Sequence, residues 1–203
     1  MKRKKPTRAT GQDGKPDWPK QLRFDIEYAK QQIRDHGSCD MLLVIYPRSG
    51  PPNVLYAGKN LRRDAGSKES MYGMAHLIAI ATDATAFAFI SEAWMAPADS
   101  PVLPSQSERR EECIVACVCH RDEHDEKHWL GDMWRIERGP NGKPNGFTHI
   151  GADKMVPENF RVRDIIPDQS PNAESVMAAR QALAELQNAG VVASQSVRAR
   201  HDA

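Results

Sequence analysis

Hydrophobic residues recur with helical spacing in three segments of the chain. The first segment begins at Asp17, a residue type that caps helices, has Pro19 in its first turn, and ends at Gly37. Its apolar face is formed by Leu22, Ile26, Ala29 and Ile33. Ser67 is positioned to cap a second helix, which is apolar over more than half of its circumference. A third helix is predicted over 170–190, with Ser170 and Pro171 at its start.

Short hydrophobic runs of strand length lie between these predicted helices. They cover 41–46, 54–58, 85–96, 112–120, 128–138 and 147–151. The order of helices and strands predicts an α+β fold, with an antiparallel or mixed sheet of five to six strands and helices packed on it. By analogy, this order is similar to that of profilin-like and roadblock-like sandwiches.

The ends of the chain differ from its middle in composition. A chain of 203 residues is long enough for one well-buried domain, which we place at 17–190. Residues 1–16 and 191–203 are predicted to be flexible tails. The N-terminal tail is basic, so contact with a polyanion is an alternative to a merely solvated terminus. The residues that would make this contact are Lys2, Arg3, Lys4, Lys5 and Arg8.

The overall composition is that of an ordinary globular protein. The chain is 40% hydrophobic and 27% charged, with a formal net charge of +1, so nothing draws it globally to nucleic acid or membrane. It has neither a secretory signal nor a run of about 20 apolar residues, and we therefore expect a cytoplasmic protein without a membrane partner. Phosphate-binding loops, dinucleotide fingerprints and the common hydrolase and deaminase motifs are missing.

The stretch CIVACVCHRDEHDEKHW at 113–129 is rich in cysteine and histidine. As a strand it places Cys113, Cys117 and Cys119 on one face, and both faces are apolar, which is typical of an interior strand with reduced thiols. The alternative is a zinc site, although the spacing is not that of common zinc motifs. Its ligands would be Cys117 and Cys119 with His120 or His124, and His149 as an extra ligand.

Glu92 is the one acidic residue of a hydrophobic strand. A carboxylate in such surroundings needs a partner, and Arg109 or Arg110 at the start of the next strand could provide an ion pair. Alternatively, Glu92 would be a general base or metal ligand beside His76 or His120. His76 lies on a helix between apolar residues, where a core histidine is the simpler interpretation.

Aromatic and basic residues also lie near one another after residue 128. They are Trp129, Trp134 and Phe147 with Arg135, Arg138, Lys143 and Lys154. Such a set could form a base-stacking surface, but tryptophans in strands more often pack in a core.

Two neighbouring segments, FISEAWMA and PSQSERREECIVACV, resemble a pattern found in uncharacterised proteins of bacteria, plasmids and phages. In this pattern a strand ending in Ser-Glu-x-Trp is followed by Pro-Ser and then by Arg-x-Glu. The matching residues are Ser91, Glu92, Trp94, Pro104, Ser105, Arg110 and Glu112. The resemblance covers about residues 70–138 and implies no activity. It implies that Glu92 and Arg110 belong together, and that the source is a mobile element such as a phage.

These observations favour a non-catalytic interaction or regulatory protein that binds a protein partner or associates with itself as a homodimer. No cofactor is required, with zinc as the alternative. One competing hypothesis is a metal-dependent enzyme that uses Glu92 with histidine or cysteine of 117–128. The other is a nucleic-acid-associated protein that uses its basic N-terminal tail.

Overall fold

A computed structural model describes residues 16–57, 65–97, 99–151 and 161–188 of the chain. Residues 1–15 of the predicted N-terminal tail, which include its basic residues, lie outside the described residues, as do the predicted C-terminal tail and Lys154. In chain order the elements are α1 (Trp18–His36), β1 (Met41–Pro47), β2 (Asn53–Ala57), α2 (Ala65–Ala81), β3 (Ala84–Met95), η1 (Pro104–Gln106), β4 (Glu111–Arg121), β5 (Lys127–Arg138), β6 (Pro144–Gly151), η2 (Arg161–Asp164) and α3 (Ala173–Asn188). The predicted α+β class is confirmed, whereas the profilin-like order is not.

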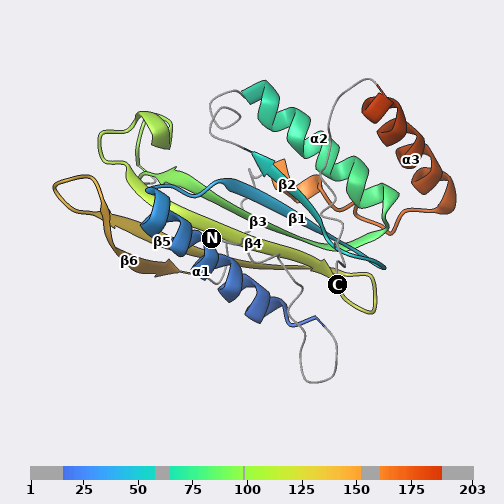
Figure 1. Ribbon diagram of the computed structural model, residues 1–203, viewed down its shortest axis with the longest axis horizontal. Coiled ribbons are helices and arrows are strands. Elements are labelled where there is room, and N and C mark those ends of the chain that lie inside the picture. The colour runs from blue at the N-terminus through green and yellow to red at the C-terminus, as the bar shows by residue number, and fades with distance from the viewer. Residues whose placement is uncertain (1–15, 58–64, 98, 152–160, 189–203) are drawn as a thin grey trace, which may run out of the picture.

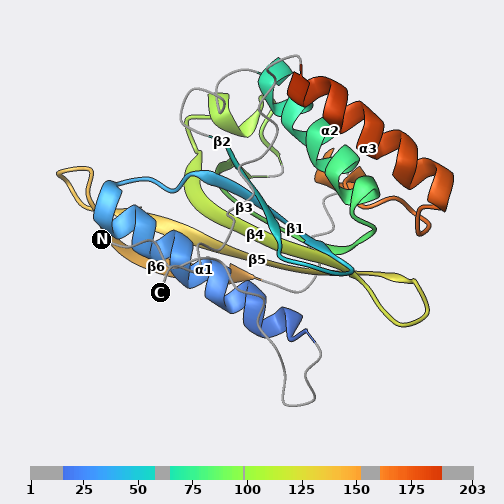
Figure 2. The same ribbon diagram turned by 45° about the vertical axis from the view of Figure 1, so that its right-hand side comes forward.

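The six strands form one antiparallel sheet in the order β2-β1-β3-β4-β5-β6. Helix α1 covers one face of the sheet, and α2 and α3 lie side by side on the other face (Figures 1 and 2). Helix α1 contacts β3 to β6, while α2 packs on β1 to β3, so the two layers are offset across the sheet. No helix within the described residues combines the length and the apolar character that a membrane crossing requires.

The predicted ends of α1 are confirmed. The Asp17 side chain accepts a hydrogen bond of 2.9 Å from the backbone N–H of Lys20, in the way expected of a helix cap. At the other end Gly37 has φ of 75°, which suits glycine, and its N–H donates to the carbonyl of Ile33 at 2.8 Å. Local sequence therefore sets the length of this helix.

Strand β4 separates two hydrophobic cores. Its residues Ile114, Ala116 and Val118 face α1, whereas Cys117 and Cys119 face α2. This alternation is the one that its sequence predicts for an interior strand. All four cysteines are buried, and none of them forms a disulfide bond.

Several element boundaries differ from the predictions; helix α2, for example, begins at Ala65, ahead of its predicted cap Ser67. Strand β6 begins at Pro144 instead of residue 147, because Pro144 pairs with Arg138 on an edge strand, where a residue without an N–H is tolerated. Helix α3 begins at Ala173, and Asn172 caps it by accepting from the N–H of Ser175 at 2.8 Å. Ser170, the predicted cap, instead bonds to Asp125, a tertiary contact that the local sequence does not reveal.

Candidate functional site

Residues 96–110 connect β3 to β4 at one end of the sheet. The two strands remain paired as far as Met95 and Glu111, so the sheet holds both ends of the connector in place. Ser107 is buried; its N–H donates to the carbonyl of Leu103 at 3.2 Å, and its Oγ accepts from the N–H of Arg109 at 3.2 Å. Although this connector is long, local hydrogen bonds fix the conformation of residues 103–110.

Arg110 joins the connector to Trp94 at the end of β3. Its guanidinium carbon lies 4.8 Å from the centre of the Trp94 ring, within the range of a cation–π interaction. The same guanidinium donates a hydrogen bond of 2.7 Å to the carbonyl of Ser105 in η1. The structure thus brings together three residues of the Ser-Glu-x-Trp, Pro-Ser and Arg-x-Glu pattern, namely Trp94, Ser105 and Arg110.

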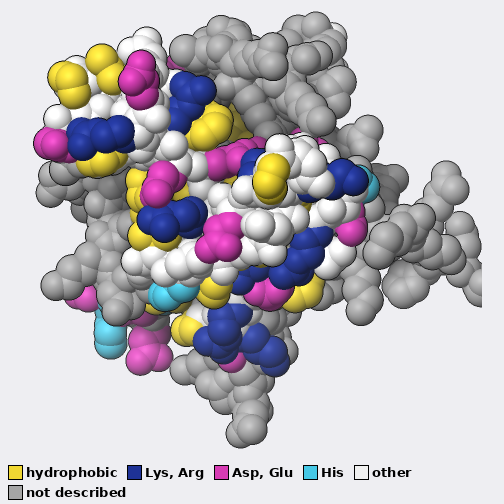
Figure 3. Space-filling view, turned by 90° about the vertical axis from the view of Figure 1, so that its left-hand side faces the viewer, with side chains coloured by type: hydrophobic (Ala, Val, Ile, Leu, Met, Phe, Trp, Pro, Cys, Tyr) yellow, Lys and Arg dark blue, Asp and Glu magenta, His cyan; other side chains and the backbone are white. Residues whose placement is uncertain are grey.

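The connector carries exposed hydrophobic side chains. Seven large hydrophobic residues are exposed among the described residues, and three of them, Trp94 (44%), Val102 (44%) and Leu103 (65%), belong to this region. We call these three residues the connector surface. Figure 3 faces this end of the molecule and shows hydrophobic side chains among charged ones. The sequence signal was the Val-Leu pair within an otherwise polar, proline-rich connector.

A groove of about 370 Å³ lies at the base of the connector, where β3 ends and β4 begins. The residues that line it are Met95, Ala96, Pro97, Arg109 and Glu111. Arg109 pairs with Asp99 at 2.8 Å, and Glu111 pairs with Arg135 at 2.8 Å. An apolar centre with a polar, charged rim is the usual anatomy of a protein-binding surface.

Glu92 has a structural role in the fold. Its carboxylate accepts a hydrogen bond from the backbone N–H of Cys39, which follows α1. The hydrogen bond with Glu112 is the main reason that the pKa of the Arg138 guanidinium is raised, and the negative charge of Glu92 adds to this effect. Arg110, the predicted partner, contacts Trp94 and Ser105 instead. The Glu92–Arg110 ion pair therefore stays a prediction, and Arg138 is a cation that sequence reasoning missed.

The histidines proposed to act with Glu92 lie elsewhere. His76 is on α2, which covers the face of the sheet opposite to α1. Its Nδ1 lies 3.2 Å from the carbonyl oxygen of Ile165. His120 pairs with Ala86, six residues from Glu92 along β3, which corresponds to about 20 Å in a strand. This geometry does not bring an acid–base pair together around Glu92.

The cysteine and histidine residues of β4 are separated by the sheet. Cys117 and Cys119 lie in the core under α2, where burial raises the pKa of each thiol to about 12. His120 lies on the other face, stacked on Trp18 of α1 with 5.5 Å between ring centres. A metal ion held jointly by these cysteines and His120 is therefore incompatible with the fold, because β4 stands between the ligands.

The aromatic residues of the predicted base-stacking surface are also divided. Trp129 contacts Phe87 on the α2 side, with ring centres 5.6 Å apart. Trp134 and Phe147 pack against the α1 side, where Lys30 Nζ lies 3.1 Å from the centre of the Trp134 ring. Because Lys30 occupies that ring face, a base could stack there only by displacing it.

Comparisons of the chain with protein-family models, curated proteins and solved structures found no match. The functional argument therefore depends on the geometry of the molecule itself.

Proposed function

We propose that the chain is a non-catalytic interaction or regulatory protein that binds a protein partner through the connector surface. The observation that carries this proposal is that three of the seven exposed large hydrophobic residues in the described part of the chain, Trp94, Val102 and Leu103, belong to the end of β3 and the connector that follows it. Exposed apolar side chains that gather in one place, with a charged rim, are typical of binding sites. Trp94 is also the residue type most enriched among residues that dominate binding energy.

The roles of the candidate catalytic groups support a function without chemistry. Glu92 bonds to the backbone at Cys39, and His76 bonds to the backbone at Ile165. The thiol of Cys117 has a pKa of about 12 because it is buried, and a thiol rather than a thiolate is a weak nucleophile. These groups stabilise the fold, so the surface is the place to search for function.

Site-specific photocrosslinking tests the proposal directly. A photoreactive phenylalanine derivative replaces Leu103 in the full chain within bacterial cells, and the crosslinked products are identified by mass spectrometry. Met177 on α3, which is 70% exposed, provides the matched control position. We expect a discrete crosslinked product from position 103 that position 177 does not give.

The products would also distinguish the kinds of partner. A product with twice the mass of the chain would identify self-association, and a heterologous product would identify another protein. Equal, diffuse labelling from positions 103 and 177 would contradict the proposal. The Trp94→Ala variant should reduce the specific product, because the anchor of the surface is removed.

The narrower parts of the proposal are a cytoplasmic location, assembly as a homodimer and an origin in a phage or other mobile element. The last of these depends only on the resemblance of Ser91 to Glu112 described above. Contact of the N-terminal tail with nucleic acid stays an alternative prediction. A tail deletion that leaves polyanion binding and its salt dependence intact would contradict that alternative.

A further inference from the structure

The turn between β4 and β5 brings three potential metal ligands together. Single ligand atoms of Asp122, Glu126 and His128 all lie within 4.8 Å of one another, the one such group found among the described residues. The turn lies at the opposite end of β4 from the connector surface, so it concerns a separate site. Glu126 and His128 are exposed and Asp122 is partly buried, so an ion can reach them.

The backbone of the turn aligns these ligands. Asp122 Oδ1 accepts hydrogen bonds from the N–H groups of His124 at 2.8 Å and Glu126 at 3.0 Å. Its other carboxylate oxygen lies 2.7 Å from Nε2 of His128. This contact is the main reason that the pKa of Asp122 is lowered to about 2. The turn thereby holds the Asp122 carboxylate beside His128.

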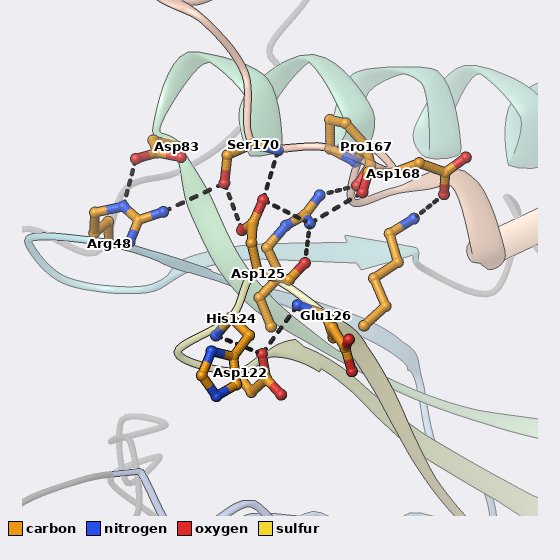
Figure 4. Close-up of polar contacts among 11 residues, drawn as sticks. Arg48, Asp83, Asp122, His124, Asp125, Glu126, Pro167, Asp168 and Ser170 are labelled. Atoms are coloured by element: carbon orange, nitrogen blue, oxygen red, sulfur yellow. Dashed lines mark hydrogen bonds and ion pairs between the residues drawn. The ribbon is translucent and has the colours of Figure 1, made fainter.

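The opposite side of the turn is anchored to the body of the protein. Asp125 accepts from the Ser170 hydroxyl at 2.6 Å, and Arg121 donates to the Asp125 carbonyl at 2.9 Å (Figure 4). Lys127 pairs with Asp168 at 2.6 Å. Figure 4 shows Asp125 directed toward Ser170 while Asp122 and His124 lie on the other side of the turn. These contacts restrict the turn without occupying the three ligands.

The ring of His128 is held in position by stacking on a second histidine ring. It stacks on His120, its register partner in β4, with ring centres 5.3 Å apart and an angle of 26° between the planes. His120 is in turn stacked on Trp18.

We propose that Asp122, Glu126 and His128 form a binding site for a divalent transition-metal ion, with Zn²⁺ as the best fit. Zinc prefers imidazole nitrogen and carboxylate oxygen among protein ligands, and three protein ligands leave a fourth position for water. Calcium and magnesium prefer oxygen ligands alone, so the imidazole of His128 favours a transition-metal ion over these two ions. This site uses none of the cysteines that the sequence suggested.

His128 can bind a metal ion through Nε2 only when that nitrogen carries no hydrogen. Its Nε2 now faces Asp122, and this nitrogen must present a lone pair to the ion. A neutral imidazole meets this need by carrying its proton on Nδ1, without net proton release. A protonated imidazole releases one proton to solvent when the ion binds.

The structure provides a matched control pair on the next hairpin. His149 lies 2.7 Å from Asp132, and the two histidine side chains are similarly exposed, at 49% for His149 and 46% for His128. The pair of His149 and Asp132 has no third ligand within reach among the described residues. If a histidine–aspartate pair were sufficient, both pairs would bind the ion.

The test is equilibrium binding of Zn²⁺ and Co²⁺ to the full chain purified without a histidine tag. We expect about one ion per chain, and we expect His128→Ala and Glu126→Gln to weaken binding by roughly tenfold or more. His149→Ala should bind like the unaltered chain. The Co²⁺ complex should show visible ligand-field bands but no thiolate charge-transfer band, because no cysteine is a ligand.

Three results would overturn the proposal. They are the absence of stoichiometric binding, equal losses in His128→Ala and His149→Ala, and a strong thiolate charge-transfer band. Glu126 is exposed and its substitution should not perturb folding, so Glu126→Gln remains decisive even where His128→Ala alters the stack with His120. Thermal melts of each variant without metal would verify that the fold is retained.

Discussion

Arg138 and Glu112 join the end of β5 to the start of β4 through a two-pronged ion pair, in which Nη2 of the arginine donates to Glu112 at 2.8 Å. The same guanidinium donates to the carbonyl of Gly37 at 3.1 Å, immediately after α1. Arg138 therefore ties the C-terminal end of α1 to the sheet. Both charged side chains are largely buried, at 27% and 18% exposure.

Replacing Arg138 by alanine should destabilise the protein by about 1–3 kcal/mol, because Glu112 and the Gly37 carbonyl each lose a charged donor. Urea unfolding monitored by circular dichroism would measure this loss. The neighbouring pair of Arg135 and Glu111 is more exposed, at 42% and 43%, so Arg135→Ala should cost less than about 1 kcal/mol. Equal losses in the two variants would contradict the structural role of Arg138.

Asp25 should make stability depend on pH. Its side chain is buried against the sheet side of α1, and burial raises its pKa to about 7, although Gln21 donates to it at 2.9 Å. An unfolded aspartate has a pKa of about 3.9, so the folded state favours the protonated form. The stability that this preference provides is complete below about pH 4 and is lost as the pH rises to about 7.

The Asp25→Asn variant should therefore be more stable than the unaltered chain at pH 8, and the difference should disappear toward pH 4. Chemical unfolding at several pH values would measure both curves. The same change at Asp35, Asp35→Asn, is the matched control. Gln31 donates to Asp35 at 2.8 Å with the same i,i+4 spacing, but on an exposed part of α1. Parallel curves for the unaltered chain and Asp25→Asn would show that Asp25 does not titrate in this range.

Leu103→Ser should weaken partner binding without reducing stability. The side chain is 65% exposed, so its removal costs little packing in the folded chain. Sedimentation velocity over a range of concentrations would detect loss of self-association, and Met177→Ser serves as the control for a general change in surface polarity. Loss of stability in Leu103→Ser would contradict the surface role assigned to this residue.

The thiols should be unreactive in the folded protein. Burial raises the pKa to about 11 for Cys113 and about 12 for Cys117 and Cys119, and only the thiolate reacts quickly. A thiol-specific chromogenic reagent should label them only after unfolding. Rapid labelling of the folded chain at pH 8 would contradict their burial.

Among the described residues, the sequence alone identified the three α-helices and the six strands, because their signals are local, but it identified neither of the short helices η1 and η2. The cap at Asp17, the stop at Gly37 and the alternating cysteines of β4 each depend on residues within a few positions. Side-chain direction in a strand alternates regardless of which strands lie beside it. For the same reason, the sequence correctly predicted that β4 is an interior strand.

Contacts between distant parts of the chain could not be read in this way. Glu92 bonds to Cys39, 53 residues away, and Arg138 bonds to Gly37, 101 residues away. Neither partner is implied by local spacing, because each contact depends on where α1 ends relative to β3 and β5. The same holds for Ser170, which would serve as a helix cap by its sequence but is bound by Asp125 of the β4–β5 turn.

The candidate sites show the same division between local and tertiary information. The sequence by itself determined that 113–129 is a strand leading into a polar turn, since apolar alternation and turn residues are encoded locally. Only the tertiary structure decided which of its metal-binding residues share a side. The sheet stands between Cys117 and His120, whereas reversal of the chain at the turn brings Asp122, Glu126 and His128 together. Ligand geometry depends on three-dimensional proximity, and the spacing of Asp122, Glu126 and His128 along the chain does not give the conformation of the turn that brings their side chains together.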